Sequence, residues 1–144
     1  MRIISGYLKG KKIDLPKDDL TRPLKDMVKE SIFNIIEHSN DISFKLKEAV
    51  VLDLFSGTGS FGLECISRGA KKVIFNENYN SAIEILEKNI KNLNCENKCQ
   101  ILKSDCFNLL KNFNEKVDII FMDPPFKEER INKLIISITE ANIL

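Results

Sequence analysis

Two short segments of this sequence carry the residue types that ligand binding and a chemical step would need. The first spans residues 52–62, LDLFSGTGSFG, where an aliphatic run containing Asp53 breaks into three glycines. The second is Asp123-Pro124-Pro125-Phe126, which follows the apolar run VDIIF and Met122. Glycine lets a chain turn sharply and approach a ligand closely. Consecutive prolines fix φ and keep the preceding residue extended, so the second segment predicts a rigid ledge.

The ledge suits the activation of an aromatic amine. The Asp123 carboxylate and the Pro124 carbonyl are acceptors that can face one planar NH2 group, and Phe126 offers a face on which a base can stack. An aromatic amine is a poor nucleophile because its lone pair is delocalised into the ring. If the two acceptors take hydrogen bonds from both N–H groups in an out-of-plane geometry, the lone pair is localised toward a methyl donor. Catalysis would then come from positioning and electrostatics. An X-Pro-Pro sequence alone can also simply begin a loop.

The glycine segment has two interpretations. GTGSFG satisfies the dinucleotide-binding pattern G-x-G-x-x-G, and Glu77 follows Gly57 at the distance of the acid that binds ribose hydroxyls. However, Asp53 would place negative charge close to a pyrophosphate, whereas it suits an ammonium or sulfonium cation. A hydride-transfer site also has no need of the Asp123–Phe126 ledge. A nicotinamide oxidoreductase is therefore the least favoured interpretation.

The elements around these segments alternate between strand and helix. We expect strands at 50–55, 72–75, 99–102 and 117–122, and helices at 61–68, 81–93, 107–113 and 127–139. This alternation predicts an α/β fold with a mostly parallel sheet covered by helices on both faces. Ligands bind beyond the carboxyl ends of such strands, so one cleft is expected to gather Asp53 with the glycines, Glu77, Asp105 and the ledge.

The N-terminal part is expected to be separate from this alternation. Residues 2–15 predict a small hairpin turning at Gly6 and Gly10, and a helix over 24–37 would bury Val28, Ile32, Ile35 and Ile36. Cations cluster here and predict a surface for a nucleic-acid backbone, namely Arg2, Lys9, Lys11, Lys12, Arg22, Lys25 and Lys29. Solvated lysines that protect an exposed edge are the alternative.

Composition narrows the class of protein. The 144 residues, 43% of them hydrophobic, suit one domain, and 22 basic against 21 acidic residues give a net charge of +1 that announces no nucleic-acid partner. The four cysteines form no C-x-x-C pair and the single histidine, His38, is distant, so we expect no metal site. There is no apolar run long enough for a membrane span, and we expect a cytoplasmic protein.

The motifs together resemble a known family. LDLFSGTG, LECISRGA, a glutamate ending the next strand, SDC and DPPF are similar to class I methyltransferases that use S-adenosylmethionine. RIISGYLKGKKIDLP and TRPLKDMVKESIFNII further resemble the start of the RsmD family, the 16S ribosomal RNA guanine-N2 methyltransferases. The resemblance implies a single Rossmann-like domain over 1–144. Residues 1–48 would face RNA, and residues 49–144 would hold the cofactor and the catalytic site.

The same resemblance implies roles for individual residues. The cofactor S-adenosylmethionine would be held by Asp53, Phe55, Ser56, Gly57, Thr58 and Gly59 at its methionine part, by Glu77 and Asn78 at its ribose, and by Asp105 and Cys106 at its adenine. Asp123, Pro124, Pro125 and Phe126 would hold the guanine amine. The partner would be 16S ribosomal RNA or the 30S subunit, met by the N-terminal cations.

The sequence departs from the family pattern at three places. Leu24 replaces a usual threonine, and Tyr79 stands where an aspartate is common. The resemblance also implies a longer chain with a seven-stranded sheet, so its C-terminal strands are expected to be missing. Strand 117–122 would then keep an unpaired edge, which predicts marginal stability, dimerisation through that edge or weak activity. An adenine-N6 methyltransferase of DNA or RNA, and a non-catalytic cofactor- or RNA-binding domain, remain alternatives.

Overall fold

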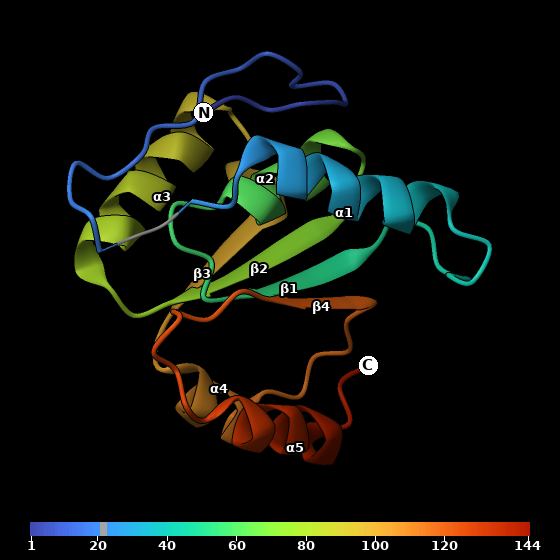
Figure 1. The fold of residues 1–144 in the computed structure, drawn as a ribbon, viewed down its shortest axis with the longest axis vertical. Coiled ribbons are helices and arrows are strands. Elements are labelled where there is room, and N and C mark those ends of the chain that lie inside the picture. The colour runs from blue at the N-terminus through green and yellow to red at the C-terminus, as the bar shows by residue number, and fades with distance from the viewer. Residues whose placement is uncertain (21–22) are drawn as a thin grey trace.

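Buried strands and amphipathic helices alternate along the chain and build a single sheet (Figure 1). The computed structural model describes residues 1–20 and 23–144. Its strands are β1 (Val50–Leu54), β2 (Lys72–Glu77), β3 (Cys99–Lys103) and β4 (Ile119–Met122). Its helices are α1 (Asp26–His38), α2 (Ser60–Ser67), α3 (Asn80–Asn92), α4 (Cys106–Asn112) and α5 (Ile131–Ala141), with a 3₁₀ turn, η1, at Glu96–Lys98. The predicted α/β class is confirmed.

The sheet has the strand order β3-β2-β1-β4, and every pair is parallel. From β1 the chain moves outward through β2 to β3, and it then returns to the opposite side of β1 to form β4. The order therefore reverses between β1 and β4. In open α/β sheets this switch point is where loops diverge and a ligand crevice forms.

Helices cover both faces of the sheet, as predicted (Figure 1). The N-terminal segment, α1, α2 and α3 lie on one face, and their core includes Ile13, Phe33, Leu63 and Leu86. Helices α4 and α5 lie on the other face over a smaller core that includes Leu54 and Leu134. Strands β1 and β2 are buried from both sides, which explains why apolar residues follow one another in them, as in residues 50–52 and 73–75.

The N-terminal hairpin forms, with one antiparallel bridge between Arg2 and Lys12. Backbone hydrogen bonds from Ile3 N to Lys11 O and from Ile13 N to Met1 O close it. Gly6 is the tight point, because a Cβ there would lie 1.9 Å from the carbonyl oxygen of Ser67, and its φ is +84°. The hairpin is thereby docked on the C-terminal end of α2.

The predicted buried face of α1 is confirmed at Ile32 and Ile36 and wrong at Val28 and Ile35. Val28 and Ile35 are exposed, whereas Lys29 and Phe33 are buried, with Ile32 and Ile36 packed beside them. The helix turns this way because the Phe33 ring stacks on Phe61 of α2, with centroids 5.0 Å apart. Lys29 can accompany it into the core because a buried carboxylate, Glu64, lies 3.5 Å from its ammonium group.

Strand β4 lies at one edge of the sheet. Within the described residues it pairs with β1 alone, over Ile119–Met122, so its other edge makes no ladder. It is also shorter than the predicted 117–122, because the backbone N–H of Val117 bonds instead to the carbonyl of Ile143 beyond α5. Association of two chains through this edge stays a prediction.

Candidate functional site

The glycine turn joins β1 to α2 in a conformation that only glycine adopts readily. Gly57 and Gly59 have φ values of 54° and 89°, and the N–H of Gly59 donates to the carbonyl of Ser56 at 2.9 Å. A Cβ on Gly59 would lie 2.5 Å from a Leu86 methyl of α3. From α3, the buried Asn89 amide also donates to the carbonyl of Thr58 at 3.1 Å. The turn is thus held from beneath.

Glu77, at the end of β2, meets this turn as predicted. One oxygen of its carboxylate accepts the N–H of Gly57 at 2.8 Å. The other accepts the N–H groups of Asn78 and Tyr79 at 2.9 and 3.0 Å. Asn78 is exposed beside it. The ends of β1 and β2 are therefore joined through a partly exposed carboxylate, the group that suits a pair of ribose hydroxyls.

Asp53 lies beneath the turn with its carboxyl group turned toward α2. Only 1% of it is exposed, and it accepts the N–H of Gly62 at 3.1 Å. Burial raises the pKa of Asp53 to about 8, the Gly62 N–H opposes this, and the charges of Glu77 and Asp123 add to it. A cation near the turn would stabilise its ionised form, so the group fits the charge of an ammonium or sulfonium ligand.

Asp105 follows β3 and begins α4. Its carboxylate caps the helix by accepting the N–H groups of Phe107 and Asn108 at 3.0 and 3.4 Å. Cys106 beside it is buried, and burial with the Asp105 charge raises the pKa of its thiol to about 11. The thiol is thus neutral at pH 7.

Arg130 joins this corner of the site, and sequence reasoning missed it. Its guanidinium lies 4.3 Å from the ring centroid of Phe107 and 4.0 Å from the Asp105 carboxylate, and Glu128 holds it at 2.8 Å. The segment after the ledge is thereby attached to the start of α4. The only signal of this contact in the sequence was a change of charge, from two glutamates to an arginine, just before an apolar helix.

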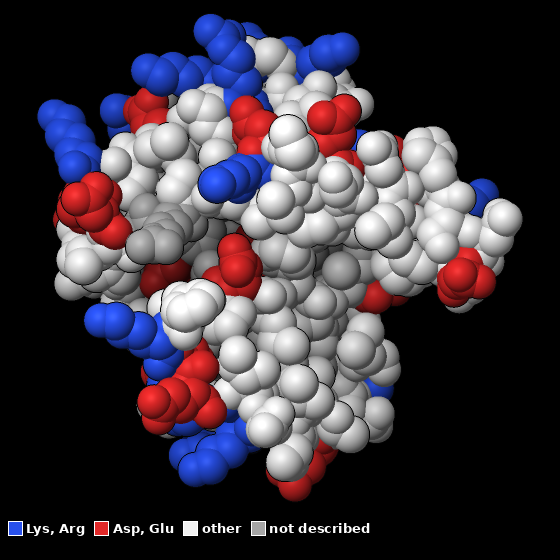
Figure 2. Space-filling view, in the orientation of Figure 1, with Lys and Arg blue, Asp and Glu red and all other residues white. Residues whose placement is uncertain are grey.

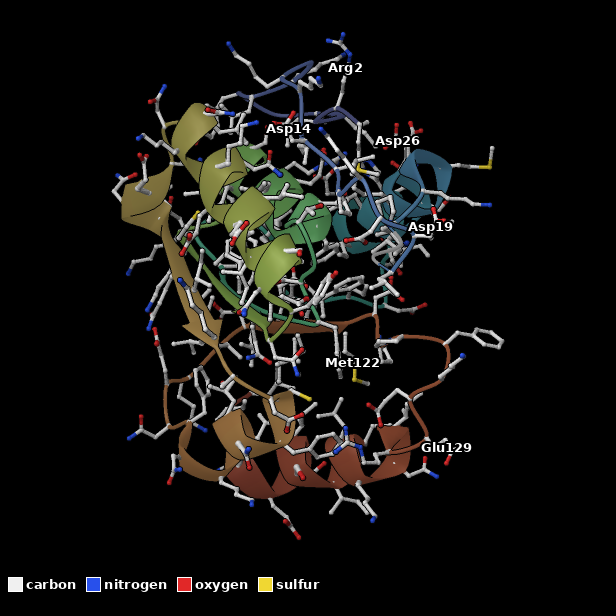
Figure 3. The ribbon with its side chains drawn as sticks, turned by 90° about the vertical axis from the view of Figure 1, so that its left-hand side faces the viewer. Arg2, Asp14, Asp19, Asp26, Met122 and Glu129 are labelled. Carbon is white, nitrogen blue, oxygen red and sulfur yellow. The ribbon has the colours of Figure 1, made fainter. Side chains whose placement is uncertain are left out.

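The ledge continues from β4 on the other side of the switch point. Asp123, Pro125 and Phe126 are exposed, and the carbonyl of Pro125 accepts the N–H of Glu128 at 2.8 Å. Because this turn occupies residues 125–128, α5 begins at Ile131 and not at the predicted 127. Met122, the last residue of β4, points toward the α4 and α5 layer, and Glu129 lies on the loop that leads to α5 (Figure 3). The Phe126 side chain is the most exposed large hydrophobic group described.

An unpaired polar atom in the glycine turn provides a test of cofactor fit. The Ser56 hydroxyl is buried without a hydrogen-bond partner, and it is the one such side-chain atom found in residues 1–20 and 23–144. Buried hydroxyls are normally paired, so a polar ligand group at the turn would satisfy it. With the acids at the ends of β2 and β3, these residues fit the carboxylate, ribose and adenine parts of S-adenosylmethionine.

Five of the seven cations of the predicted basic surface are exposed, and their contact with RNA stays a prediction. The exposed cations are Arg2, Lys9, Lys11, Lys12 and Lys25. Blue side chains gather over the hairpin at the top of Figure 2, and Figure 3 labels Arg2 at the same end of the molecule. Arg22 lies outside the described residues.

The prediction that Lys29 contacts RNA is wrong, because its side chain is 0% exposed and cannot reach a polyanion. Its nitrogen lies 3.5 Å from Glu64, whose carboxylate also binds Arg68 and the backbone N–H groups of Ile4 and Ser5, each at 2.9 Å. Lys29 therefore holds the N-terminal segment on α2. The signal for this was its spacing of four from Phe33 on one helical face.

A parallel α/β sheet with a glycine turn on one side of its switch point and a D-P-P-F ledge on the other defines a class I methyltransferase fold. Residues 1–144 match the family model described as Conserved hypothetical protein 95. This is the RsmD family that the sequence motifs resemble, and the chain belongs to it.

Its relatives carry methyltransferase names. A Bacillus subtilis protein named "Putative rRNA methyltransferase YlbH" is 35% identical over 100% of this chain and 77% of its own length. Ribosomal RNA small subunit methyltransferase D of Haemophilus influenzae is 32% identical over 100% and 73%. The structure of "Putative methyltransferase yhhF" from Escherichia coli has a TM-score of 0.85 at 28% identity, covering 100% of this chain and 74% of that one.

Neither a metal-binding cluster nor a membrane-spanning helix is found among the described residues. Residues 1–20 and 23–144 hold no cluster of three or more His, Cys, Asp or Glu side chains able to bind a metal ion. The same part of the chain has no helix that is long and apolar enough to cross a membrane. The cytoplasmic location stays a prediction.

Proposed function

We propose that this protein transfers a methyl group from S-adenosylmethionine to the exocyclic N2 amine of a guanine in 16S ribosomal RNA. The observation that carries the proposal is the pair of structures flanking the switch point. A glycine turn with a buried acid lies after β1, and an exposed acidic ledge lies after β4, the neighbouring parallel strand. A small cofactor and a large acceptor can thus approach one point from two sides.

On the cofactor side, each residue has a role that its position supports. Phe55, Ser56, Gly57, Thr58 and Gly59 surround the methionine part, and the buried Asp53 beneath them would ionise as the cationic ligand binds. Glu77 and Asn78 receive the ribose, and Asp105 with the backbone of Cys106 receives the adenine. When bound, the cofactor would supply an electrophilic methyl group on a sulfonium: the guanine nitrogen would take the methyl group, S-adenosylhomocysteine would be the leaving group, and one amine proton would pass to solvent at the exposed ledge.

On the acceptor side, Asp123 and the Pro124 carbonyl accept the two N–H groups of the guanine amine. The two prolines hold these acceptors in place, and Phe126 stacks on the base. The carboxylate also stabilises the positive charge that develops on nitrogen during attack. Residues 1–48 present Arg2, Lys9, Lys11, Lys12 and Lys25 to the RNA backbone, and residues 49–144 form the catalytic part.

Methyl transfer from labelled S-adenosylmethionine tests the proposal. The protein is incubated separately with 30S particles, naked 16S RNA and DNA, and the products are digested to nucleosides. We expect N2-methylguanosine from one of the two RNA substrates. N6-methyladenine would show that the ledge serves the other amine, and the guanine proposal would then be wrong.

Calorimetric titration with S-adenosylhomocysteine and with NAD separates the cofactor classes. Binding of the former and not of NAD is expected, because the ammonium group of S-adenosylhomocysteine favours ionisation of the buried Asp53, whereas a pyrophosphate opposes it. Failure to bind S-adenosylhomocysteine would overturn the assignment of the turn.

A further inference from the structure

One row of residues crosses the sheet at the level where α2 docks. The parallel register places Asp53 of β1 opposite Phe75 of β2 on one side and opposite Phe121 of β4 on the other. Each member of this row lies just before a functional loop. Glu77 follows two residues after Phe75, the glycine turn follows Asp53, and Asp123 follows two residues after Phe121.

Two adjacent residues of α2 contact the whole row. Gly62 donates its N–H to Asp53, and a Cβ on Gly62 would lie 2.3 Å from the ring of Phe75, so helix and strands touch without an intervening side chain. Phe61 stacks on Phe121, with centroids 3.7 Å apart and planes inclined by 10°. Helix α2 therefore fixes the positions of the ends of β1, β2 and β4 relative to one another.

The stack continues away from the sheet. Phe33 of α1 lies on the other side of Phe61 at 5.0 Å, and the Arg68 guanidinium lies 4.4 Å from the Phe33 centroid. Arg68 is in turn paired with Glu64 and Glu37. The column of Phe33, Phe61 and Phe121 thus connects the N-terminal helix, the helix of the glycine turn and the strand of the ledge.

Strand β4 needs this contact more than its neighbours do. Strands β1 and β2 are each paired on two sides, whereas β4 is paired only with β1 in the described part of the chain. A strand held by one ladder can shift or twist at its free side. The aromatic stack joins it directly to the helix of the glycine turn.

We propose that Phe121 is a positioning residue that sets the ledge at the correct height relative to the methyl donor, by stacking on Phe61. This inference rests on the proposed function. Phe121 touches no reacting atom. Its effect is on the distance between the acceptor amine and the methyl group, to which transfer is steeply sensitive.

The alternative is that Phe121 only adds to the stability of the core, and Ile120 provides the matched control. Ile120 is adjacent on the same strand and points to the opposite face, where it packs on the core of α4 and α5. It is also partly buried, as Phe121 is. Substitutions at both positions weaken the packing of β4, but only one of them removes the contact with α2.

The experiment compares Phe121→Leu, Phe121→Tyr and Ile120→Ala in the full chain. Each variant is assayed for melting temperature, for the dissociation constant of S-adenosylhomocysteine, and for kcat and KM of methyl transfer. We expect Phe121→Leu to lower kcat by about 10- to 100-fold, because a displacement near 1 Å has that effect, with cofactor affinity unchanged. Phe121→Tyr retains the ring and should restore most of kcat. Ile120→Ala should lower the melting temperature with kcat nearly intact.

Amide hydrogen exchange gives a second readout that needs no activity. Phe121→Leu should accelerate exchange of the β4 amides that pair with β1, over Ile119–Met122, while the hydrogen-bonded amides of Gly57 and Gly59 keep their wild-type rates. If Phe121→Leu and Ile120→Ala change kcat and exchange equally for equal losses of melting temperature, Phe121 is only a core residue and the inference is wrong. If the wild-type protein transfers no methyl group, the proposed function fails, and the exchange comparison still decides whether the stack positions the ledge.

Discussion

The two sides of the switch point are built in different ways. On the cofactor side, Ser56, Thr58 and Gly59 are buried, and hydrogen bonds from α3 and from Glu77 hold the turn. On the acceptor side, Asp123, Pro125 and Phe126 are exposed, and one backbone hydrogen bond closes the segment that follows. The first half depends on the surrounding fold, whereas the second depends on two prolines and an edge strand.

This difference suits the size of the two ligands that we propose. A small cofactor must be surrounded, so its site needs buried, satisfied groups held in advance. A nucleotide within a large RNA brings its own structure, so its site can remain open and present a few stiff acceptors. The comparison predicts that substitutions on the cofactor side act mainly on stability and those on the ledge mainly on transfer.

Glu64→Gln gives the largest effect expected on stability. The substitution removes the buried carboxylate beside the Lys29 ammonium and leaves only the exposed Asp26 carboxylate, at 3.9 Å, so we expect the free energy of unfolding to fall by about 3–5 kcal/mol. Denaturant unfolding followed by circular dichroism measures it. The double variant Lys29→Met with Glu64→Gln removes the unpaired charge and should recover part of the loss. Equal stability of Glu64→Gln and wild type would show that the N-terminal segment is not held by this pair.

Asp123→Asn is the converse substitution, on the ledge. Because the side chain is exposed, the melting temperature should not change, while transfer falls on the order of 10²–10³-fold through loss of the charge that faces the developing cation. Cofactor affinity, measured by calorimetry, should be retained. Glu129→Gln, an exposed acid six residues later, is the control and should transfer normally. Full activity of Asp123→Asn would refute the role of the ledge.

Sequence reasoning recovered what depends on local pattern. Strand and helix alternation, the glycine turn, and the meeting of Glu77 with Gly57 all followed from spacing and strand polarity. It missed what depends on distant partners. Nothing near Lys29 in the sequence announces Glu64, and periodicity alone placed Val28 and Ile35 on the buried face. The aromatic column was invisible for the same reason, since Phe33, Phe61 and Phe121 come from three separate elements.

The smallest effect that we predict is the pH dependence of stability, which tests the burial of Asp53 on the cofactor side. Burial raises the pKa of Asp53 to about 8, so the folded protein keeps this proton between about pH 4 and 8 while the unfolded chain has lost it. The folded state then binds more protons than the unfolded state, and the free energy of unfolding must decrease as pH rises through this range. One proton corresponds to at most about 1.4 kcal/mol per pH unit.

Denaturant unfolding between pH 5 and 8 measures this slope, and Asp53→Asn supplies the control because it cannot ionise. We expect the wild-type protein to lose stability relative to Asp53→Asn as pH rises, with the difference levelling off above about pH 8, where both folded and unfolded chains carry the ionised group. Parallel curves for the two proteins would mean that Asp53 is ionised beneath the turn throughout. The cofactor side would then carry its negative charge permanently, and the contrast in burial between the two halves would not extend to charge.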